Sequence, residues 1–264
     1  MKPDLERLTL SVCDLCRQTG KFILAELDHV KESDILTKSP NNFVTYVDKQ
    51  SEDRLKERLS ALLPGSGFIA EESPDARMAE NYNWIIDPLD GTTNFIHGIP
   101  LFSISIALME GKNIVSGVVY EMNLAECFYA WAGSKAYLNG KEIHVSETSG
   151  INGSLFATGF PYYDYSKLDE YMNFFRFLLK NSRGARRLGS AAADLAYVAC
   201  GRFDGFYEYG LSPWDVAAGA LIVKQAGGRV TDFKGQENFL MGKEIIATNL
   251  NLYSNFMQAF RKFF

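Results

Sequence analysis

Two aspartates, Asp87 and Asp90, stand three positions apart just after an apolar run. Pro88 forces an extended conformation on Asp87 and donates no backbone hydrogen bond, so a strand should end here with both carboxylates at its tip. Carboxylate pairs of this kind bind Mg²⁺ together with waters and a substrate phosphate. Gly91 would let the backbone approach closely, and amides of a turn that begins at Thr92 could face a phosphate. An ordinary Asp-Gly turn with Asp90 as a helix cap is the alternative.

A second acidic segment, Glu71-Glu72-Ser73, also follows a short apolar run. Two neighbouring strands could therefore deliver Glu71 and Asp87 to one edge of a sheet. The alternative is a solvated surface loop, where paired glutamates are common.

A third acid, Asp215, lies in the segment Ser212-Pro213-Trp214-Asp215 at the start of a predicted helix. Ser212 as N-cap, Pro213 as first helical residue and Asp215 as the acid of a capping box explain the segment structurally. A carboxylate has several lone pairs, so Asp215 could also face a shared cleft.

Periodicity predicts two helices and a sheet to position the first two segments. Asn139-Gly140 adds a strong hairpin signal. The expected helices are 3–27 and 48–63, with a loop at 38–41 between them, and the expected strands are 67–70, 84–87, 103–109, 114–121, 126–131, 136–138 and 142–145. This half is predicted to be two helices against a largely antiparallel sheet.

A polar stretch with Gly and Ser at 147–153 predicts a boundary between two halves, 1–147 and 148–264. Beyond it, helix and strand patterns alternate. The expected strands are 154–158, 205–209, 229–232 and 245–248, and the expected helices are 167–180, 191–200, 213–226 and 252–263. This βαβ-like order favours an α/β half that supplies Asp215, packed on an α+β half that supplies the other acids.

Composition excludes several classes of protein. The net charge of −5 and the lack of a long basic run disfavour direct nucleic-acid binding. Apolar stretches fall well short of the roughly 20 residues that cross a bilayer, and residues 1–10 do not resemble a secretory signal, so a cytoplasmic protein is expected. Cys13 and Cys16 lie in a helical pattern, which favours packing as reduced thiols over zinc or redox chemistry.

The three acidic segments together, in this order, resemble the inositol monophosphatase family: Glu-Glu-Ser at 71–73, Asp-Pro-Leu-Asp-Gly-Thr-Thr-Asn-Phe at 87–95 and Trp-Asp at 214–215. The resemblance covers nearly the whole chain, including the approach to the second helix at 44–48. It implies a layered αβαβα sandwich of the inositol monophosphatase and fructose bisphosphatase type. It also implies two or three Mg²⁺ ions per active site, lithium sensitivity and a homodimer.

Residue roles follow from the resemblance. Glu71, Asp87 and the backbone carbonyl of Leu89 match the ligands of a first magnesium ion, and Asp87, Asp90 and Asp215 match those of a second. Thr92, paired with Asp48, matches the residues that orient a metal-bound water. The implied catalytic residues are Asp48, Glu71 and Thr92, and the implied substrate-binding residues are Asp90, Gly91, Thr92, Ala191, Glu208 and Asp215.

The implied reaction is magnesium-dependent hydrolysis of a small phosphorylated polyol or sugar by in-line attack of water, with myo-inositol monophosphate as the leading substrate. Relatives act on fructose 1,6-bisphosphate, histidinol phosphate and nucleotide phosphates, so these remain open. Phe160 stands where some relatives carry a small polar substrate contact. Family members often carry a basic residue near the metals, and either Thr37 or Lys38 could occupy that position in this sequence. Arg186 and Arg187 could steer anions or form a surface contact.

Two other classes compete. Haloacid dehalogenase-type phosphatases also have an Asp-Gly-Thr motif, but one residue separates their two aspartates, whereas two residues separate Asp87 from Asp90. An interaction protein on this fold would be expected to lose at least one acid of the metal set, and all are present. A partner-binding role in addition to catalysis remains open.

Overall fold

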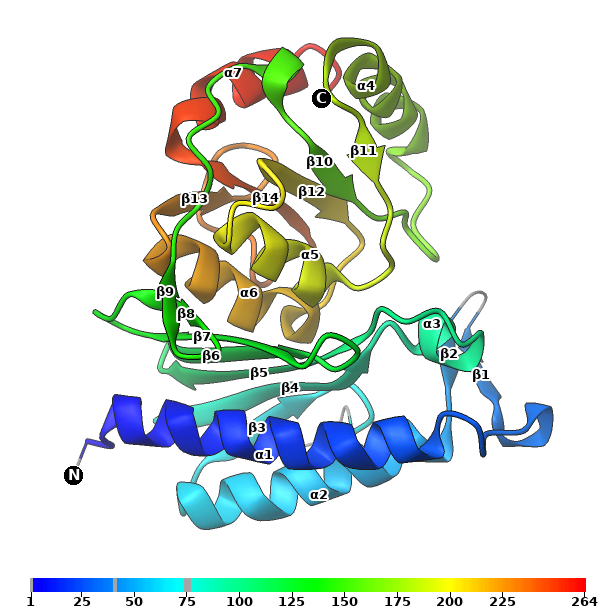
Figure 1. The fold of residues 1–264 in the computed structure, drawn as a ribbon, viewed down its shortest axis with the longest axis vertical. Helices are drawn as coiled ribbons and strands as arrows, with labels where there is room; N and C mark the ends of the chain where they lie inside the picture. The colour runs from blue at the N-terminus through cyan, green and yellow to red at the C-terminus, as the bar shows by residue number, and fades with distance from the viewer. Residues whose placement is uncertain (1, 40–41, 74–76) are drawn as a thin grey trace.

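Five stacked layers make up the molecule in a computed structural model that describes residues 2–39, 42–73 and 77–264 (Figure 1). A helix pair covers one face of a large sheet, a second helix pair lies between that sheet and a smaller one, and a third pair covers the far side. This arrangement confirms the αβαβα sandwich. The helices are α1 (Leu5–Glu26), α2 (Tyr46–Leu62), α3 (Thr92–Ile96), α4 (Leu168–Asn181), α5 (Ala191–Ala199), α6 (Pro213–Gln225) and α7 (Leu250–Phe260).

The first layer consists of α1 and α2, close to the predicted bounds. Asp4 caps α1 by accepting a hydrogen bond from the Arg7 amide (3.1 Å), and the buried face of α1 includes Cys13 and Cys16. All four cysteines are free thiols, as expected for packing. Helix α2 begins two residues earlier than predicted because Thr45, not a later residue, is its N-cap.

The large sheet has the order β3-β4-β5-β6-β7-β8-β9, with β3 parallel to β4 and all other pairs antiparallel. Its strands are β3 (Gly67–Ala70), β4 (Tyr82–Asp90), β5 (Ser103–Glu110), β6 (Asn113–Glu121), β7 (Glu126–Trp131), β8 (Ala136–Leu138) and β9 (Lys141–Ile143). The prediction that β4 ends at Asp87 is wrong. The strand continues to Asp90 through a register shift opposite β5, where Pro88 needs no ladder donor.

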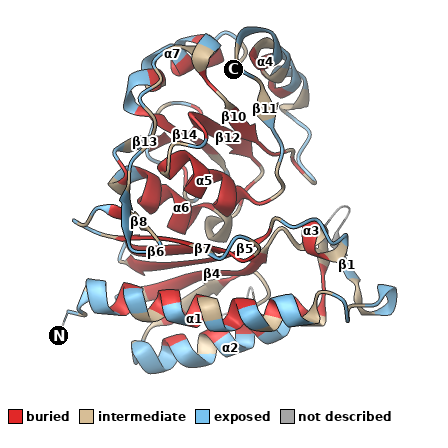
Figure 2. Cartoon of the chain, in the orientation of Figure 1, coloured by how far each residue is buried: buried red, intermediate tan, exposed pale blue. Residues whose placement is uncertain are grey.

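The central layer is α5 and α6, which are buried almost throughout (Figure 2). Close approach to the sheet depends on glycine: a Cβ at Gly117 of β6 would lie 2.8 Å from the backbone oxygen of Ala218 in α6. A Cβ at Gly219 would lie 2.5 Å from the Cβ of Leu195 in α5. These contacts let α6 pack closely on the large sheet and α5 pack closely on α6.

The smaller sheet has the order β11-β10-β12-β14-β13, and only β10 with β11 and β10 with β12 are parallel pairs. The second half is therefore a mixed sheet rather than a run of βαβ units. Its strands are β10 (Phe156–Thr158), β11 (Ala185–Arg186), β12 (Gly205–Tyr209), β13 (Gly228–Thr231) and β14 (Glu244–Asn249). Helices α4 and α7 cover its outer face with a cluster of aromatic rings.

A two-stranded hairpin, β1 (Leu36–Ser39) and β2 (Asn42–Val44), replaces much of the predicted loop. The prediction is wrong for Lys38 and Ser39, which belong to β1. Pro40 and Asn41 lie outside the described residues, as does the side chain of Lys38, so no role is assigned to it.

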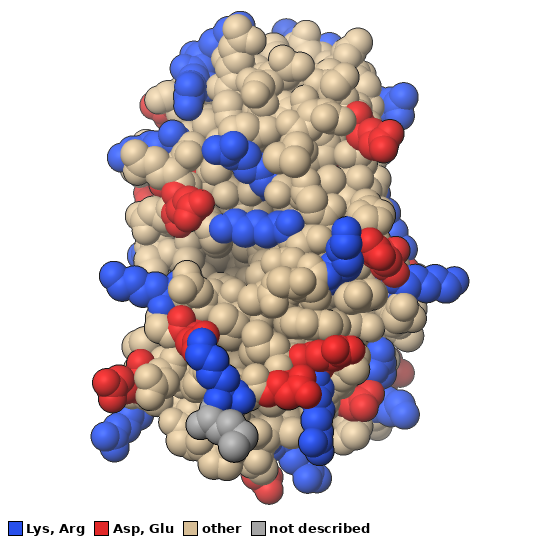
Figure 3. Space-filling model, turned by 90° about the vertical axis from the view of Figure 1, so that its left-hand side faces the viewer, with Lys and Arg blue, Asp and Glu red and all other residues tan. Residues whose placement is uncertain are grey.

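The described helices include none that is both long and apolar enough to cross a membrane. On the face of the molecule in Figure 3, basic and acidic side chains are interspersed. That face offers no continuous basic stripe for a nucleic-acid backbone.

Candidate functional site

One cavity collects nearly all of the predicted site residues. It lies where the end of β4, the N-termini of α5 and α6, and β12 meet. Its lining includes Glu71, Asp87, Leu89, Asp90, Gly91, Thr92, Ala191, Glu208 and Asp215. Asp48 is absent from the lining and reaches the site through Thr92.

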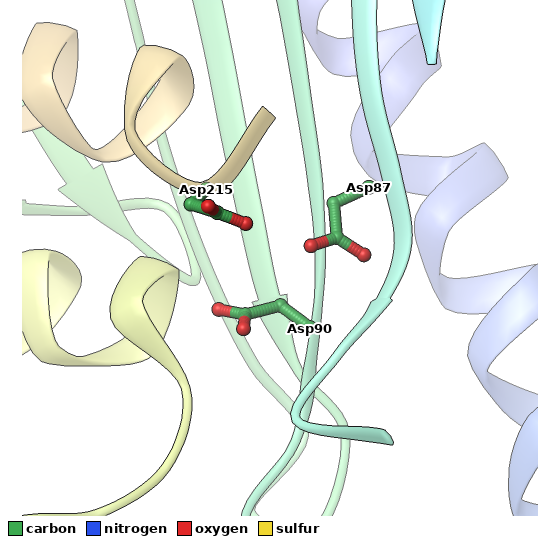
Figure 4. Close-up of side chains that lie close together, drawn as sticks. All are labelled: Asp87, Asp90 and Asp215. Atoms are coloured by element: carbon green, nitrogen blue, oxygen red, sulfur yellow. The ribbon is translucent and has the colours of Figure 1, made fainter. Parts of the chain in front are cut away.

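Three carboxylates of the cavity lining point toward one another (Figure 4). Asp87 and Asp90 come from either side of the β4 register shift, and Asp215 comes from the first turn of α6. Each offers an oxygen, and these three oxygens lie within 4.8 Å of one another. An all-oxygen set of this kind suits Mg²⁺, which takes carboxylate oxygens and keeps several waters.

Local hydrogen bonds hold two of these carboxylates from behind. Asp90 Oδ2 accepts from the Ser190 hydroxyl (2.7 Å) and from the Ala192 amide (2.7 Å) at the start of α5. Asp215 Oδ2 accepts from the Ser212 amide (2.7 Å), as the predicted capping box requires. The capping role and the cavity-facing role of Asp215 therefore coexist.

The electrostatics of the cluster call for a cation. Burial, followed by repulsion from the neighbouring acids, raises the pKa of Asp87 and of Asp215 well above the ordinary range. Burial also raises the pKa of Asp90 to about 6, against the effect of its hydrogen bonds from Ser190 and Ala192. A bound divalent cation would offset this repulsion and favour the ionised carboxylates.

Glu71 follows β3, which is parallel to β4, so the prediction that two neighbouring strands deliver acids to one edge is confirmed. Its backbone amide donates to the carbonyl of Ile86 (3.2 Å). Glu71 lies outside the set of three converging oxygens, yet its charge raises the pKa of Asp87, Asp90 and Asp215. Its role as a metal ligand stays a prediction.

Thr92, which follows Gly91 in the sequence, contributes a hydroxyl group to the cavity lining. The Thr92 Oγ1 lies 3.0 Å from both Asp48 Oδ1 and the carbonyl oxygen of Leu89. Asp48 is fixed in turn, because its Oδ2 accepts from the amide (2.8 Å) and hydroxyl (2.6 Å) of Thr45. Gly91 has φ 98°, a conformation that strongly favours glycine.

The cavity lining also contains Glu208 and Ala191, as predicted, and groups to which sequence reasoning gave no settled role. Ala191 lies beside the carboxylates, because its neighbours Ser190 and Ala192 both donate to Asp90. Arg187 lines the cavity and donates to the Tyr162 hydroxyl (3.1 Å), whereas Arg186 lies outside the lining. Asp194 also lines it. The missed signal for Asp194 was an acid within a helix of otherwise small and apolar residues.

Comparisons with known proteins agree with this geometry. The model of the "Inositol monophosphatase family" matches residues 4–263. "Nus factor SuhB" of Pseudomonas aeruginosa is 40% identical over 242 residues, covering 90% of this chain and 89% of that protein. "Inositol-1-monophosphatase" of Mesorhizobium japonicum is 37% identical over 246 residues, covering 93% and 92%.

Solved structures show the same fold along the whole chain. The extragenic suppressor protein suhB of Bartonella henselae matches with a TM-score of 0.92 and 36% identity, covering 98% of this chain and 99% of that one. The Thermotoga maritima IMPase matches with a TM-score of 0.88 and 35% identity, covering 98% of each chain.

Proposed function

Because the chain belongs to the inositol monophosphatase family, we propose that it hydrolyses myo-inositol monophosphate to inositol and phosphate with the help of Mg²⁺. The convergence of Asp87, Asp90 and Asp215 in the cavity lining carries the proposal. Family membership also removes the haloacid dehalogenase alternative. A homodimer, lithium sensitivity and a cytoplasmic location belong to the same proposal and rest on the family resemblance alone.

Two overlapping sets of ligands would hold the ions. Glu71, Asp87 and the carbonyl of Leu89 would hold one ion, and Asp87, Asp90 and Asp215 a second; the family resemblance implies two or three ions in all. When bound, Mg²⁺ lowers the pKa of the attacking water and neutralises charge on the phosphate and the leaving oxygen.

The remaining residues position the reactants. Thr92, held by Asp48, would orient the attacking water through its hydroxyl. The amides of Gly91 and Thr92 would hold the phosphate oxygens. Glu208, together with Ala191, would contact hydroxyls of the leaving alcohol.

The Thr92 hydroxyl gives a specific prediction. We expect Thr92→Val to lower kcat for inositol 1-phosphate by about 100-fold, because the hydroxyl is lost while side-chain volume is kept. Thr92→Ser keeps the hydroxyl and should retain most of the activity. Steady-state kinetics of the two variants test the role; equal kcat values for wild type and Thr92→Val would refute it.

The proposed function is tested by phosphate release from inositol 1-phosphate, fructose 1,6-bisphosphate, histidinol phosphate and a nucleoside 3′,5′-bisphosphate, each with and without magnesium. The expected result is magnesium-dependent turnover with inositol 1-phosphate preferred. Preference for one of the other three would assign the chain to that activity on the same fold. No turnover of any substrate by a folded protein would contradict the proposal.

A second candidate function is a protein-binding role as a Nus factor, favoured by the name of several relatives, including the protein from Pseudomonas aeruginosa and one from Escherichia coli that is 41% identical over 235 residues. Such a role would use a surface other than the cavity. Binding to a protein partner should survive the change Asp90→Asn, whereas phosphatase turnover should not. Measuring partner binding and phosphate release in that variant separates the two functions.

A further inference from the structure

The cavity lining contains two further acids, Glu208 and Asp194, whose negative charge is weakly compensated. Glu208 comes from β12 and Asp194 from α5, and both are buried. Among the residues that the structure describes, Arg187 is the only cation that lowers the pKa of either, and it opposes the stronger effect of burial on both. Burial raises the pKa of Glu208 to about 8. Two carboxyl groups and one guanidinium therefore line the cavity in addition to the three converging aspartates.

Glu208 packs closely against the backbone of Gly159. A Cβ at Gly159 would clash with both carboxyl oxygens of Glu208 where they lie, so glycine leaves room for this carboxyl group. Arg187 is held by one hydrogen bond and packs beside Gly189. Its guanidinium donates to the Tyr162 hydroxyl (3.1 Å), and a Cβ at Gly189 would lie 2.7 Å from its Nη1.

Asp194 differs from the other buried aspartates. Its side chain is 1% exposed, and Oδ1 has no hydrogen-bond partner among the described residues. By contrast, the buried Asp204 accepts from the Ser146 hydroxyl (2.6 Å) and the Leu155 amide (2.7 Å). A buried carboxyl oxygen without a partner is destabilising, so folding alone does not account for Asp194.

Hydroxyl groups are the ligands that suit the carboxyl groups of Asp194 and Glu208. A hydroxyl can donate to one carboxyl group and accept from another, so adjacent hydroxyls on a ring can satisfy a pair of carboxyl groups. A second phosphate placed here would meet a single guanidinium to match its charge and two carboxyl groups that repel it when ionised, which is unfavourable. The chemistry therefore distinguishes a polyol from a bisphosphate.

We propose that Asp194 is a specificity-determining residue that, together with Glu208, binds adjacent hydroxyls of the leaving alcohol and discriminates against substrates with a second phosphate on that alcohol. This proposal rests on the proposed phosphatase function. It assigns a substrate contact to Asp194 and explains why an unpartnered acid is retained in α5.

Two matched variants test the proposal. Asp194→Ala should raise KM for inositol 1-phosphate roughly tenfold, with kcat changed far less, because a hydroxyl partner is lost. The KM for p-nitrophenyl phosphate, whose leaving alcohol has no further hydroxyls, should change far less. The preference for inositol 1-phosphate over fructose 1,6-bisphosphate should become smaller. Asp204→Ala removes a satisfied buried aspartate outside the cavity, so it should lower Tm without changing the ratio of KM values.

The outcomes separate this proposal from the proposed function. A KM for inositol 1-phosphate within about twofold of wild type in Asp194→Ala, or an equal rise for p-nitrophenyl phosphate, would overturn the role of Asp194. If wild type hydrolyses no phosphomonoester, the proposed function fails, and calorimetric titration with myo-inositol in the presence of magnesium and phosphate decides the contact. Weaker binding to Asp194→Ala supports it; equal binding, or no binding to either protein, overturns it.

Discussion

Asp90→Asn should abolish magnesium-dependent turnover, with kcat lowered by about 1,000-fold or more. The neutral amide removes one charge from the three converging carboxylates, which share the neutralisation of the cations. The fold should survive, because the amide oxygen can still accept from the Ser190 hydroxyl and the Ala192 amide. Phosphate release at saturating magnesium measures the loss.

The matched control is Asp232→Asn. Asp232 is buried, and its Oδ1 accepts from the amides of Lys234 and Gln236 (2.9 and 2.7 Å), outside the cavity lining. Activity near that of wild type is expected for this control. Retention of more than about a tenth of wild-type kcat by Asp90→Asn would show that the aspartate cluster is not the metal site.

Local sequence signals predicted most of the fold because the elements concerned carry their own instructions. Ser212 is a hydroxyl cap with an acid three residues on, and Asn139-Gly140 adopts positive φ at both positions. The elements that were missed are short. Strand β11 has two residues and depends on pairing with β10, which no local pattern announces. The boundary at residue 147 between two halves stays a prediction.

The aspartate cluster of the site could be predicted because its residues lie within short motifs. The register shift that brings Asp87 and Asp90 together was not anticipated, since Pro88 indicated only that the strand should stop. The grouping of residues around Glu208 was harder to predict. Asp194 and Arg187 carry no motif, and their proximity to Glu208 arises from the packing of α5 against the smaller sheet, which is a long-range property.

Chelation of magnesium should remove activity and also reverse the pH dependence of stability. An acid whose pKa is raised on folding binds protons more tightly in the folded state than in the unfolded state, so stability falls as pH rises between the two pKa values. For Asp90 this interval runs from the ordinary value of 3.8 to about 6. Asp87 and Asp215 extend the loss to higher pH, because their pKa values are raised further.

The metal-free protein should therefore lose on the order of 2 kcal/mol of stability from Asp90 alone between about pH 4 and about pH 7. Magnesium favours the ionised carboxylates, and at 100 times its Kd it should add about 2.7 kcal/mol at neutral pH. Calorimetric Tm values across this range, with a chelator and with magnesium, test both effects. Asp90→Asn should show a shallower fall in the chelator, since one titrating group is gone. A metal-free Tm that rises steadily from pH 4 to pH 7 would contradict the raised pKa values, and an unchanged Tm on adding magnesium at neutral pH would contradict a metal site built from these aspartates.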